Sequence, residues 1–484
     1  MSDKEEVSER SPSGGENPIL WDRAAESRAL RKVDTSVLPL LFLGLLVFQL
    51  DRMNLASALT AGFAKDVKIT QSTINLGNQM MFLGNVVLEI PSNMLLQSLG
   101  PRKWIAAQVF VFGIVATMQI FVKDQNGFLV ARSALDVSES GYIPGAIYTL
   151  SCWYTKRELA KRVAIFFFGM FGANALSPLL ASGILKLEGR QDLKGWQWLF
   201  LLEGVFTIFV SVLLAFLLPG APDQPEPLLS RGIIQFKPEE KEILQSRLEL
   251  DDEAKRNGAQ GMNIPWTLIR KTVLHYRRWP HFISTGCVFA TWSPMSTYTP
   301  SIILSLGFDR IEANALAAVG TSIALGVIFF FAWLSDRTNK RGATVIAAQS
   351  CYLISLIIAR SVHPHVGNWS RFGLWTLINA FGVGYHPVHN TWVQLNCKEP
   401  GERSISIAMW VMSAISGLMA GTQIFQGKDA PFYNTGIRTM IICVSIGIAF
   451  VLLQEFIYYR HNKKAREGVK GPEEKDGDLY YYVL

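Results

Sequence analysis

Residues 35–55 read TSVLPLLFLGLLVFQLDRMNL, an apolar run that ends around a charged pair, Asp51 and Arg52. About 20 apolar residues in a helix cross the roughly 30 Å hydrocarbon core of a bilayer. Blocks of this kind recur along the 484-residue chain, which is 49% hydrophobic and only 18% charged. A soluble chain of this length would carry more charge. The sequence therefore predicts a polytopic membrane protein.

Twelve such blocks can be placed, six on each side of a hydrophilic central stretch. The predicted spans are residues 35–55, 73–98, 104–122, 128–151, 163–185, 196–218, 281–306, 314–334, 342–362, 372–394, 404–425 and 436–459. The fold class is thus all-α, with twelve transmembrane helices in two six-helix halves. The predicted units are an N-terminal tail (1–34), a first half (35–218), a central loop (219–280), a second half (281–459) and a C-terminal tail (460–484).

Basic residues indicate the orientation of such a protein, because cytoplasmic segments are enriched in Lys and Arg. The tails, the central loop and the even-numbered loops hold most of the 46 Lys and Arg residues, although the short loops alone are nearly balanced. We therefore expect both termini in the cytoplasm and a multi-pass protein of the plasma membrane. Apolar residues at roughly helical spacing within 237–250 fit either a short surface helix or a flexible tether.

Several classes of function are disfavoured by the sequence. The net charge is +7, but the Lys and Arg residues lie next to the apolar blocks and do not form one basic face. We therefore predict no nucleic-acid partner. The G-x-S-x-G, H-E-x-x-H and G-x-x-x-x-G-K-[ST] motifs are missing from the sequence. We predict no enzyme activity, no cofactor and no metal site. The five cysteines are scattered and are interpreted as packing residues.

The fourth predicted span carries Arg132, Asp136 and Glu139 at positions i, i+4 and i+7, within about 60° of arc on one helical face. A charge near the centre of a transmembrane helix costs about 3 kcal/mol, so this stripe cannot face lipid. It must face the bundle interior or an aqueous cavity. A structural ion pair would need only one acid, and the second acid therefore favours a site that gains and loses protons over a static network.

The first span presents Asp51 and Arg52, which point about 100° apart on a helix and are poorly placed to pair with each other. Each must find another partner if the helix continues. The alternative is that the helix ends at Leu50 and both charges lie in the headgroup layer.

Other polar residues within or beside the predicted spans are weaker candidates for functional roles. Glu203 is interpreted as a structural residue or as a partner for positive groups of a cytoplasmic gate. In the tenth span His386 and Asn390, with His389 between them, are expected to line a cavity. The triplet that begins at Asn368 is an acceptor for glycosylation.

Short motifs that cover nearly the whole chain indicate a family. They are Leu50–Asn54, Glu89–Asn93, Leu99–Trp104, Arg132 with Glu139, Pro144–Gly145, Trp153–Tyr154, Glu158–Arg162, Gly195–Phe200 and Glu203–Gly204. With these motifs the chain resembles the major facilitator superfamily, and within it the anion:cation symporter family, especially its fungal allantoate permease-like branch.

The resemblance implies the major facilitator fold, in which two pseudo-symmetric halves rock about a site near the membrane midplane. It implies that Arg52 holds the anionic group of the substrate. The acids Asp51 and Glu139 would carry protons, and Arg132 would partner the acid on its own helix.

Two places depart from or add to the family pattern. Asp336, Arg337 and Arg341, after the eighth span, match the superfamily's loop signature and imply a cytoplasmic gate, whereas the acid of the equivalent loop after the second span is missing. Position 136 is usually glycine in this family, and here it is Asp136. An extra acid could alter proton stoichiometry, weaken attraction for highly charged anions or favour a substrate with a cationic group.

We therefore expect proton-coupled symport of a small organic anion of carboxylate, vitamin or ureide type, by a monomer in the lipid bilayer. One alternative is export of a secondary metabolite by proton exchange, suggested by Asp136 and by an aromatic-rich chain with 29 Phe and 13 Trp. Another is a nutrient sensor that binds without transporting and signals through the central loop.

Overall fold

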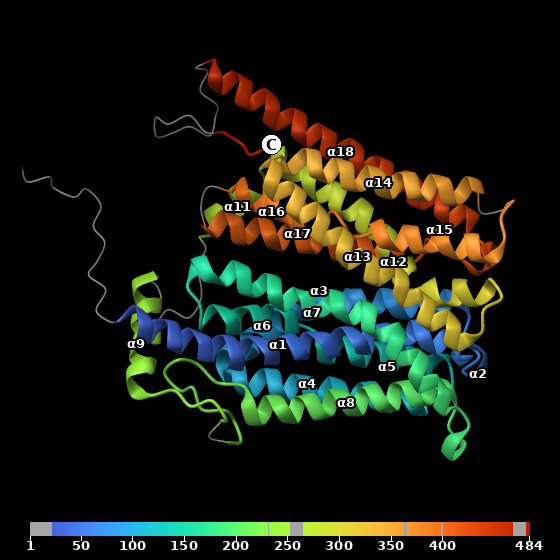
Figure 1. Cartoon of the computed structure of the whole chain (residues 1–484), viewed down its shortest axis with the longest axis horizontal. Coiled ribbons are helices and arrows are strands. Elements are labelled where there is room, and N and C mark those ends of the chain that lie inside the picture. The colour runs from blue at the N-terminus through green and yellow to red at the C-terminus, as the bar shows by residue number, and fades with distance from the viewer. Residues whose placement is uncertain (1–21, 231, 252–264, 363–364, 398–399, 468–480) are drawn as a thin grey trace, which may run out of the picture.

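The computed structural model describes residues 22–230, 232–251, 265–362, 365–397, 400–467 and 481–484. Long helices with roughly aligned axes form two bundles that lie side by side (Figure 1). The first bundle contains α1 (Arg23–Thr60), α3 (Gln71–Leu99), α4 (Pro101–Met118), α5 (Gln125–Glu139), α6 (Tyr142–Ser151), α7 (Lys156–Ile184) and α8 (Gly195–Leu217). The second contains α12 (Trp279–Ser305), α13 (Arg310–Thr338), α14 (Arg341–Val362), α15 (Asn368–Phe381), α16 (His386–Leu395), α17 (Pro400–Gly421) and α18 (Asn434–Arg466).

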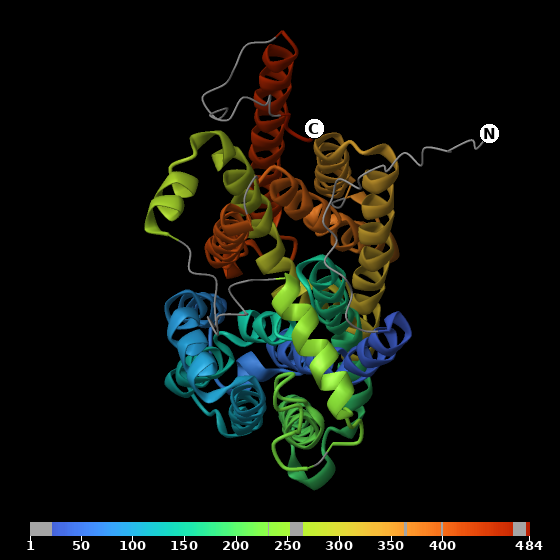
Figure 2. The same ribbon diagram turned by 90° about the vertical axis from the view of Figure 1, so that its left-hand side faces the viewer.

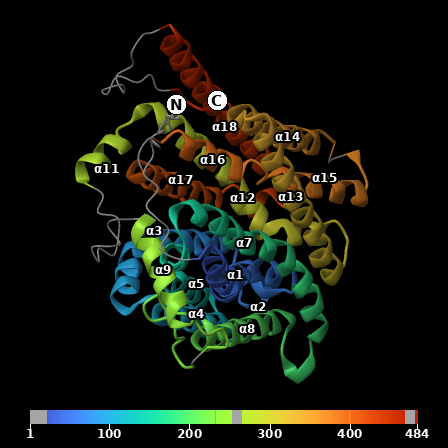
Figure 3. The same cartoon turned by 60° about the vertical axis from the view of Figure 1, so that its left-hand side comes forward.

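Two short helices serve to name the ends of the molecule. At one end, called the α9 end, α9 (Pro238–Asp251) lies across the helix ends of the first bundle, as Figure 2 shows face-on. At the opposite end, the α2 end, α2 (Phe63–Asp66) follows α1. A further helix, α11 (Trp266–Val273), lies at the α9 end beside α17 (Figure 3).

Membrane-spanning character is plain in half of the helices of the two bundles. Among the described residues, seven helices are long and apolar enough to cross a bilayer: α1, α4, α7, α8, α13, α14 and α18. The others are shorter, broken or richer in polar residues. The fold is all-α, with twelve membrane-crossing segments in two six-segment halves.

Two predicted spans, 128–151 and 372–394, were expected to be single helices, and this was wrong. The fourth span breaks after α5, where Gly141 takes a left-handed φ of 82° that favours glycine. The tenth span breaks between α15 and α16, ahead of Pro387, whose ring cannot continue the ladder of a preceding helix. The two breaks occupy corresponding positions in the two halves.

The break in the fourth span frees backbone groups, and a buried side chain satisfies one of them. Gln108 of α4 donates from Nε2 to the carbonyl of Ser140 over 2.7 Å. A buried carbonyl left without a donor would cost free energy comparable to a lost hydrogen bond. The break is therefore a supported feature of the fold.

The central stretch forms a helix, α9, so the tether interpretation of residues 237–250 was wrong. Lys32 of α1 donates from Nζ to Glu240 Oε2 over 2.6 Å, and Arg247 donates to Glu158 of α7 over 2.5 Å. These ion pairs hold α9 against the first bundle.

The segment 481–484 docks against three helices of the second bundle at the α9 end. Tyr482 is buried and stacks on Tyr458 of α18 with ring centroids 4.2 Å apart. Asn462 of α18 exchanges two hydrogen bonds of 2.8 Å with the Tyr482 backbone. Trp392 of α16 donates to the Val483 carbonyl over 2.7 Å.

Replacing Tyr482 by Ala is expected to lower the free energy of unfolding by about 2–4 kcal/mol, because a buried, stacked ring is lost and a cavity remains. The midpoint of thermal unfolding of the purified protein in detergent measures this. Tyr481→Ala is the control, since Tyr481 is 46% exposed. Equal midpoints for the two variants would show that the docked ring does not stabilise the second bundle.

Candidate functional site

A buried ion pair joins the first and fourth spans. Arg52 of α1 donates from Nε to Glu139 Oε2 over 2.6 Å, and its guanidinium carbon lies 4.3 Å from the centroid of the Phe48 ring. The Glu139 side chain has no exposed surface, whereas Arg52 keeps 14%. Arg52 Nη2 is buried and has no hydrogen-bond partner among the described residues. The guanidinium therefore has an unused donor beside its carboxylate.

The position of Glu139 explains why it needs a cation. Glu139 is the last residue of α5, beside the break at Ser140. The final carbonyls of a helix carry partial negative charge, which disfavours an ionised carboxylate there. The nearby Arg52 offsets that cost.

The other cation of the stripe, Arg132, reaches toward the second half. Its Nη2 donates to Asn78 Oδ1 over 3.1 Å, and Asn78 Nδ2 donates to Thr297 Oγ1 of α12 over 3.1 Å. Asp136 is buried and packs against α3 at Gly84, where a β-carbon would overlap its carboxylate. Glycine is thus required at position 84 for Asp136 to lie where it does.

Asp51 and Glu203 form the other part of the cluster. Thr207 of α8 donates to Asp51 Oδ2 over 2.9 Å, and Glu203, one turn earlier, is buried beside Asn54 of α1. Arg102, from the predicted loop after the second span that matches the superfamily's gate signature in part, lies near Gly220, at the opposite end of α8. Glu203 thus lies with Asp51, and its role at the cytoplasmic gate stays a prediction.

Most of the sequence-predicted charges thus come together in one buried group, which we call the charge cluster. It contains four carboxyl groups and two guanidinium groups, from Asp51, Asp136, Glu139, Glu203, Arg52 and Arg132. Four ionised carboxylates against two cations would be costly in a buried site, so the cluster is suited to hold protons.

Two expectations for this region are confirmed. The stripe on α5 is buried, with Arg132 and Asp136 each 1% exposed. The helix of the first span also continues beyond Leu50 to Thr60, so the alternative that it ends at Leu50 was wrong. Asp51 and Arg52 find separate partners, as their directions on the helix require.

His386 and Asn390 lie apart from the charge cluster, in the second half. The His386 ring packs on Trp410 and Phe289, with centroids 4.7 and 5.1 Å away. Asn390 accepts a hydrogen bond of 3.2 Å from Gln394 of its own helix. No hydrogen bond or ion pair between described residues links either side chain to Arg52 or Glu139.

His389 was expected to line a cavity with His386, and this was wrong. His389 is fully buried and pairs with His281 of α12, with Nε2 and Nδ1 3.0 Å apart. His281 in turn lies 3.2 Å from the hydroxyl of Tyr458. The pair packs the core of the second half.

The predicted gate residues are only partly brought together. Arg341 lies 2.6 Å from the Asp336 carboxylate, and its backbone N–H donates to the Leu484 carbonyl over 2.8 Å. Arg337 instead lies over the Trp333 ring, 5.7 Å from its centroid. Asn368, the glycosylation candidate, is exposed at the start of α15.

Hydrogen bonds between the two halves gather toward the α2 end. Asn314 of α13 donates to Thr60 of α1 over 2.7 Å. Asn75 of α3 donates to the Phe425 carbonyl over 2.9 Å and accepts from the hydroxyl of Tyr298 over 2.5 Å. These contacts close the interface between the halves at the α2 end.

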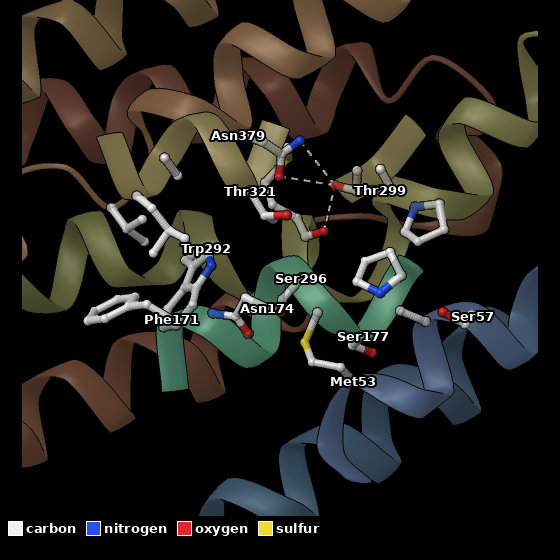
Figure 4. Close-up of a pocket in the computed structure, with 18 of the residues that line it drawn as sticks. Met53, Ser57, Phe171, Asn174, Ser177, Trp292, Ser296, Thr299, Thr321 and Asn379 are labelled. Carbon is white, nitrogen blue, oxygen red and sulfur yellow. Dashed lines mark hydrogen bonds between the residues drawn. The ribbon is translucent and has the colours of Figure 1, made fainter. Parts of the chain in front are cut away.

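A small cavity lies between the halves, next to the charge cluster along α1 (Figure 4). Its volume is about 40 Å³. Its polar lining residues are Ser57, Asn174, Ser177, Ser296, Thr299, Thr321 and Asn379, from α1, α7, α12, α13 and α15. Sequence reasoning missed all of them, and the only signal was an occasional amide within an apolar run, such as Asn174 and Asn379.

Comparison with known proteins agrees with this architecture. The family model described as Major Facilitator Superfamily matches residues 41–424. An uncharacterized transporter of Saccharomyces cerevisiae is 26% identical over 92% of this chain and 82% of its own length. A putative tartrate transporter of Agrobacterium vitis is 28% identical over 67% of this chain and 68% of its own length. The crystal structure of a bacterial homologue of the human lysosomal transporter Spinster, inward-facing and unoccupied, is 14% identical, with a TM-score of 0.66 and coverage of 91% and 99%.

The family match and the transporter relatives show that this two-bundle protein is a membrane transporter, not an enzyme. The chain belongs to the Major Facilitator Superfamily. It is a multi-pass membrane protein with a small-molecule substrate.

Proposed function

We propose that this protein is a proton-coupled symporter of a small organic anion. Arg52 binds the anionic group, and Glu139 and Asp51 carry protons. The single observation that carries this proposal is the Arg52–Glu139 pair, in which a buried guanidinium is bound by one carboxylate and keeps one unused donor. A guanidinium binds a carboxylate best through two parallel hydrogen bonds.

The proposed cycle is an exchange of partners at Arg52. A proton on Glu139 neutralises the carboxylate and weakens its hold on the guanidinium. Arg52 can then bind the substrate carboxylate with two donors. Because a proton and an anion load together, the charge of the site stays nearly constant, and no unpaired charge is left in the membrane as the halves rock.

The remaining charged residues fit supporting roles in this cycle. Asp51 and Glu139 lie within electrostatic reach of each other, so a proton on one lowers the cost of charge on the other. Arg132 is placed to sense the protonation of Glu139 and is linked through Asn78 to Thr297 in the other half. Proton loading is thereby tied to the interface that must open.

Orientation and substrate class belong to the same proposal. With both termini in the cytoplasm, the α2 end is extracellular, and closure at that end corresponds to an inward-facing state. The similarity to a putative tartrate transporter supports a small organic acid as the substrate.

Uptake by purified protein in lipid vesicles tests the function. Radiolabelled carboxylates should accumulate faster when the outside is more acidic than the inside, and a proton ionophore should remove the stimulation. Empty vesicles are the control. Uptake that ignores the pH gradient would contradict proton coupling, and binding without any flux would instead favour the sensor.

A further inference from the structure

The cavity between the halves differs sharply in chemistry from the charge cluster. None of its lining residues is ionisable: the polar groups are hydroxyls, side-chain amides and the indole N–H of Trp292, and the remainder are apolar, including Phe171. Figure 4 shows amides and hydroxyls from both halves directed toward the same space. Such groups can donate to and accept from an uncharged polar ligand, but they cannot neutralise a charge.

The cavity lies about one helical turn beyond Arg52 along α1. Ala56, which lines the cavity, is four residues after Arg52, and positions four apart are neighbours on one helical face. Met53 and Ala56 line the cavity. Gln49, one turn before Arg52, donates to Asn174 of the cavity lining over 2.9 Å. An elongated ligand held by Arg52 can therefore reach the cavity within about one helical turn.

The polar side chains that line the cavity make only a long hydrogen bond with each other. Asn379 and Thr299 lie 3.3 Å apart, at the long end for a hydrogen bond. Thr321 and Ser296 use their hydroxyl protons on carbonyls of their own helices, which leaves their oxygen lone pairs as acceptors. A donor group in the cavity would find these acceptors. One N–H of the Asn379 amide donates to the Trp375 carbonyl over 2.9 Å, and an acceptor group in the cavity could take the other N–H in place of its long bond to Thr299.

The size of the cavity indicates what part of a substrate it takes. Its volume of about 40 Å³ has room for a few water molecules. This space admits one small polar group. A second ionised carboxylate there would be buried without a cation, at a cost of several kcal/mol.

We propose that this cavity is a neutral subsite that holds an uncharged hydrogen-bonding group of the substrate. The substrate is then a monoanion that carries an amide, ureide or hydroxyl group away from its carboxylate. Dicarboxylates are selected against, so this chain differs in substrate from the relative described as a putative tartrate transporter, since tartrate is a dicarboxylate. This inference rests on the proposed function, because Arg52 must hold the single carboxylate.

A matched series of acids tests the subsite. Succinamate, succinate and butanoate share one carboxylate and differ at the other end, which is an amide, a carboxylate or a methyl group. Adipamate, adipate and hexanoate repeat the comparison at a greater reach. Affinities are measured by calorimetry on the purified full-length protein in detergent. In at least one series we expect the amide acid to bind about tenfold more tightly than the other two, since only its far end is both uncharged and hydrogen-bonded.

Variants separate the subsite from the anion site. Thr321→Val and Asn379→Leu should each remove most of the advantage of the amide acid over the methyl acid while leaving the methyl acid's affinity within about twofold. Thr321→Val keeps the side-chain shape, so it carries the test if Asn379→Leu does not fold. Thr338→Val is the control, because Thr338 lies in the same helix as Thr321, α13, but at its exposed end.

The possible results are distinguishable. A dicarboxylate that binds as tightly as the amide acid, or an amide preference that survives both variants, overturns the neutral subsite while the anion proposal stands. If no acid in either series binds, or if Arg52→Gln binds them as well as the wild type does, the proposed function fails first.

Discussion

Uptake of the organic anion by the Arg52→Gln variant should be at least about 100-fold slower than by the wild type. The variant loses a charge-assisted bidentate contact to the substrate, worth about 3 kcal/mol, and a factor of 10 corresponds to about 1.4 kcal/mol. It also leaves Glu139 buried without its cation. Initial uptake rates in lipid vesicles, normalised to the amount of folded protein, measure the effect.

Two further variants give this result its meaning. Arg52→Lys should retain a small part of the activity, because an ammonium group keeps the charge but cannot make the planar two-donor contact. Arg162→Gln is the control, because Arg162 also pairs with an acid, Asp34, but outside the charge cluster. Equal losses in Arg52→Gln and Arg162→Gln would point to a general defect and against an anion site at Arg52.

The second large effect is expected for Glu139→Gln. A neutral amide mimics the protonated acid, so Arg52 stays available to the anion and exchange of labelled for unlabelled substrate should continue. Net uptake driven by a pH gradient should fall by about tenfold or more, because the side chain can no longer release a proton. Both quantities are measured in the same vesicle preparation, with and without the gradient.

The control for this variant is Glu240→Gln, which removes an acid paired with Lys32 at the α9 end and should leave the response to the gradient intact. If Glu139→Gln vesicles still concentrate substrate in response to the gradient, Glu139 is not the coupling acid. Loss of exchange together with uptake would assign Glu139 to the support of Arg52 alone.

The fold and the part of the charge cluster on α1 and α5 could be predicted from the sequence for a simple reason. The length of an apolar segment indicates whether it can cross a membrane. Charges within apolar helices are too costly to face lipid, so Arg132, Asp136 and Glu139 had to be buried. The directions of Asp51 and Arg52 on one helix likewise excluded a mutual pair. These inferences depend on properties of single helices, which a sequence contains.

The parts that could not be predicted depend on how helices meet. Glu203 lies beside Asp51 because α8 packs on α1, and His389 pairs with His281 through the packing of α16 on α12. The neutral cavity combines groups from five helices, and neither Asn174 nor Asn379 belongs to a recognisable motif. The helix break at Gly141 was missed because one glycine within an apolar run is also compatible with an unbroken helix.

The contact between Gly84 and Asp136 restricts which neighbouring sequences can fold in the same way. A β-carbon at position 84 would overlap the carboxylate, so a gain of volume on one helix has to be matched by a loss on the other. With glycine at position 136 the constraint disappears, and alanine or serine becomes admissible at position 84. Positions 84 and 136 are therefore sterically coupled. A homologue in which the acid at position 136 has already been replaced by glycine can accept substitutions at position 84 that this chain cannot.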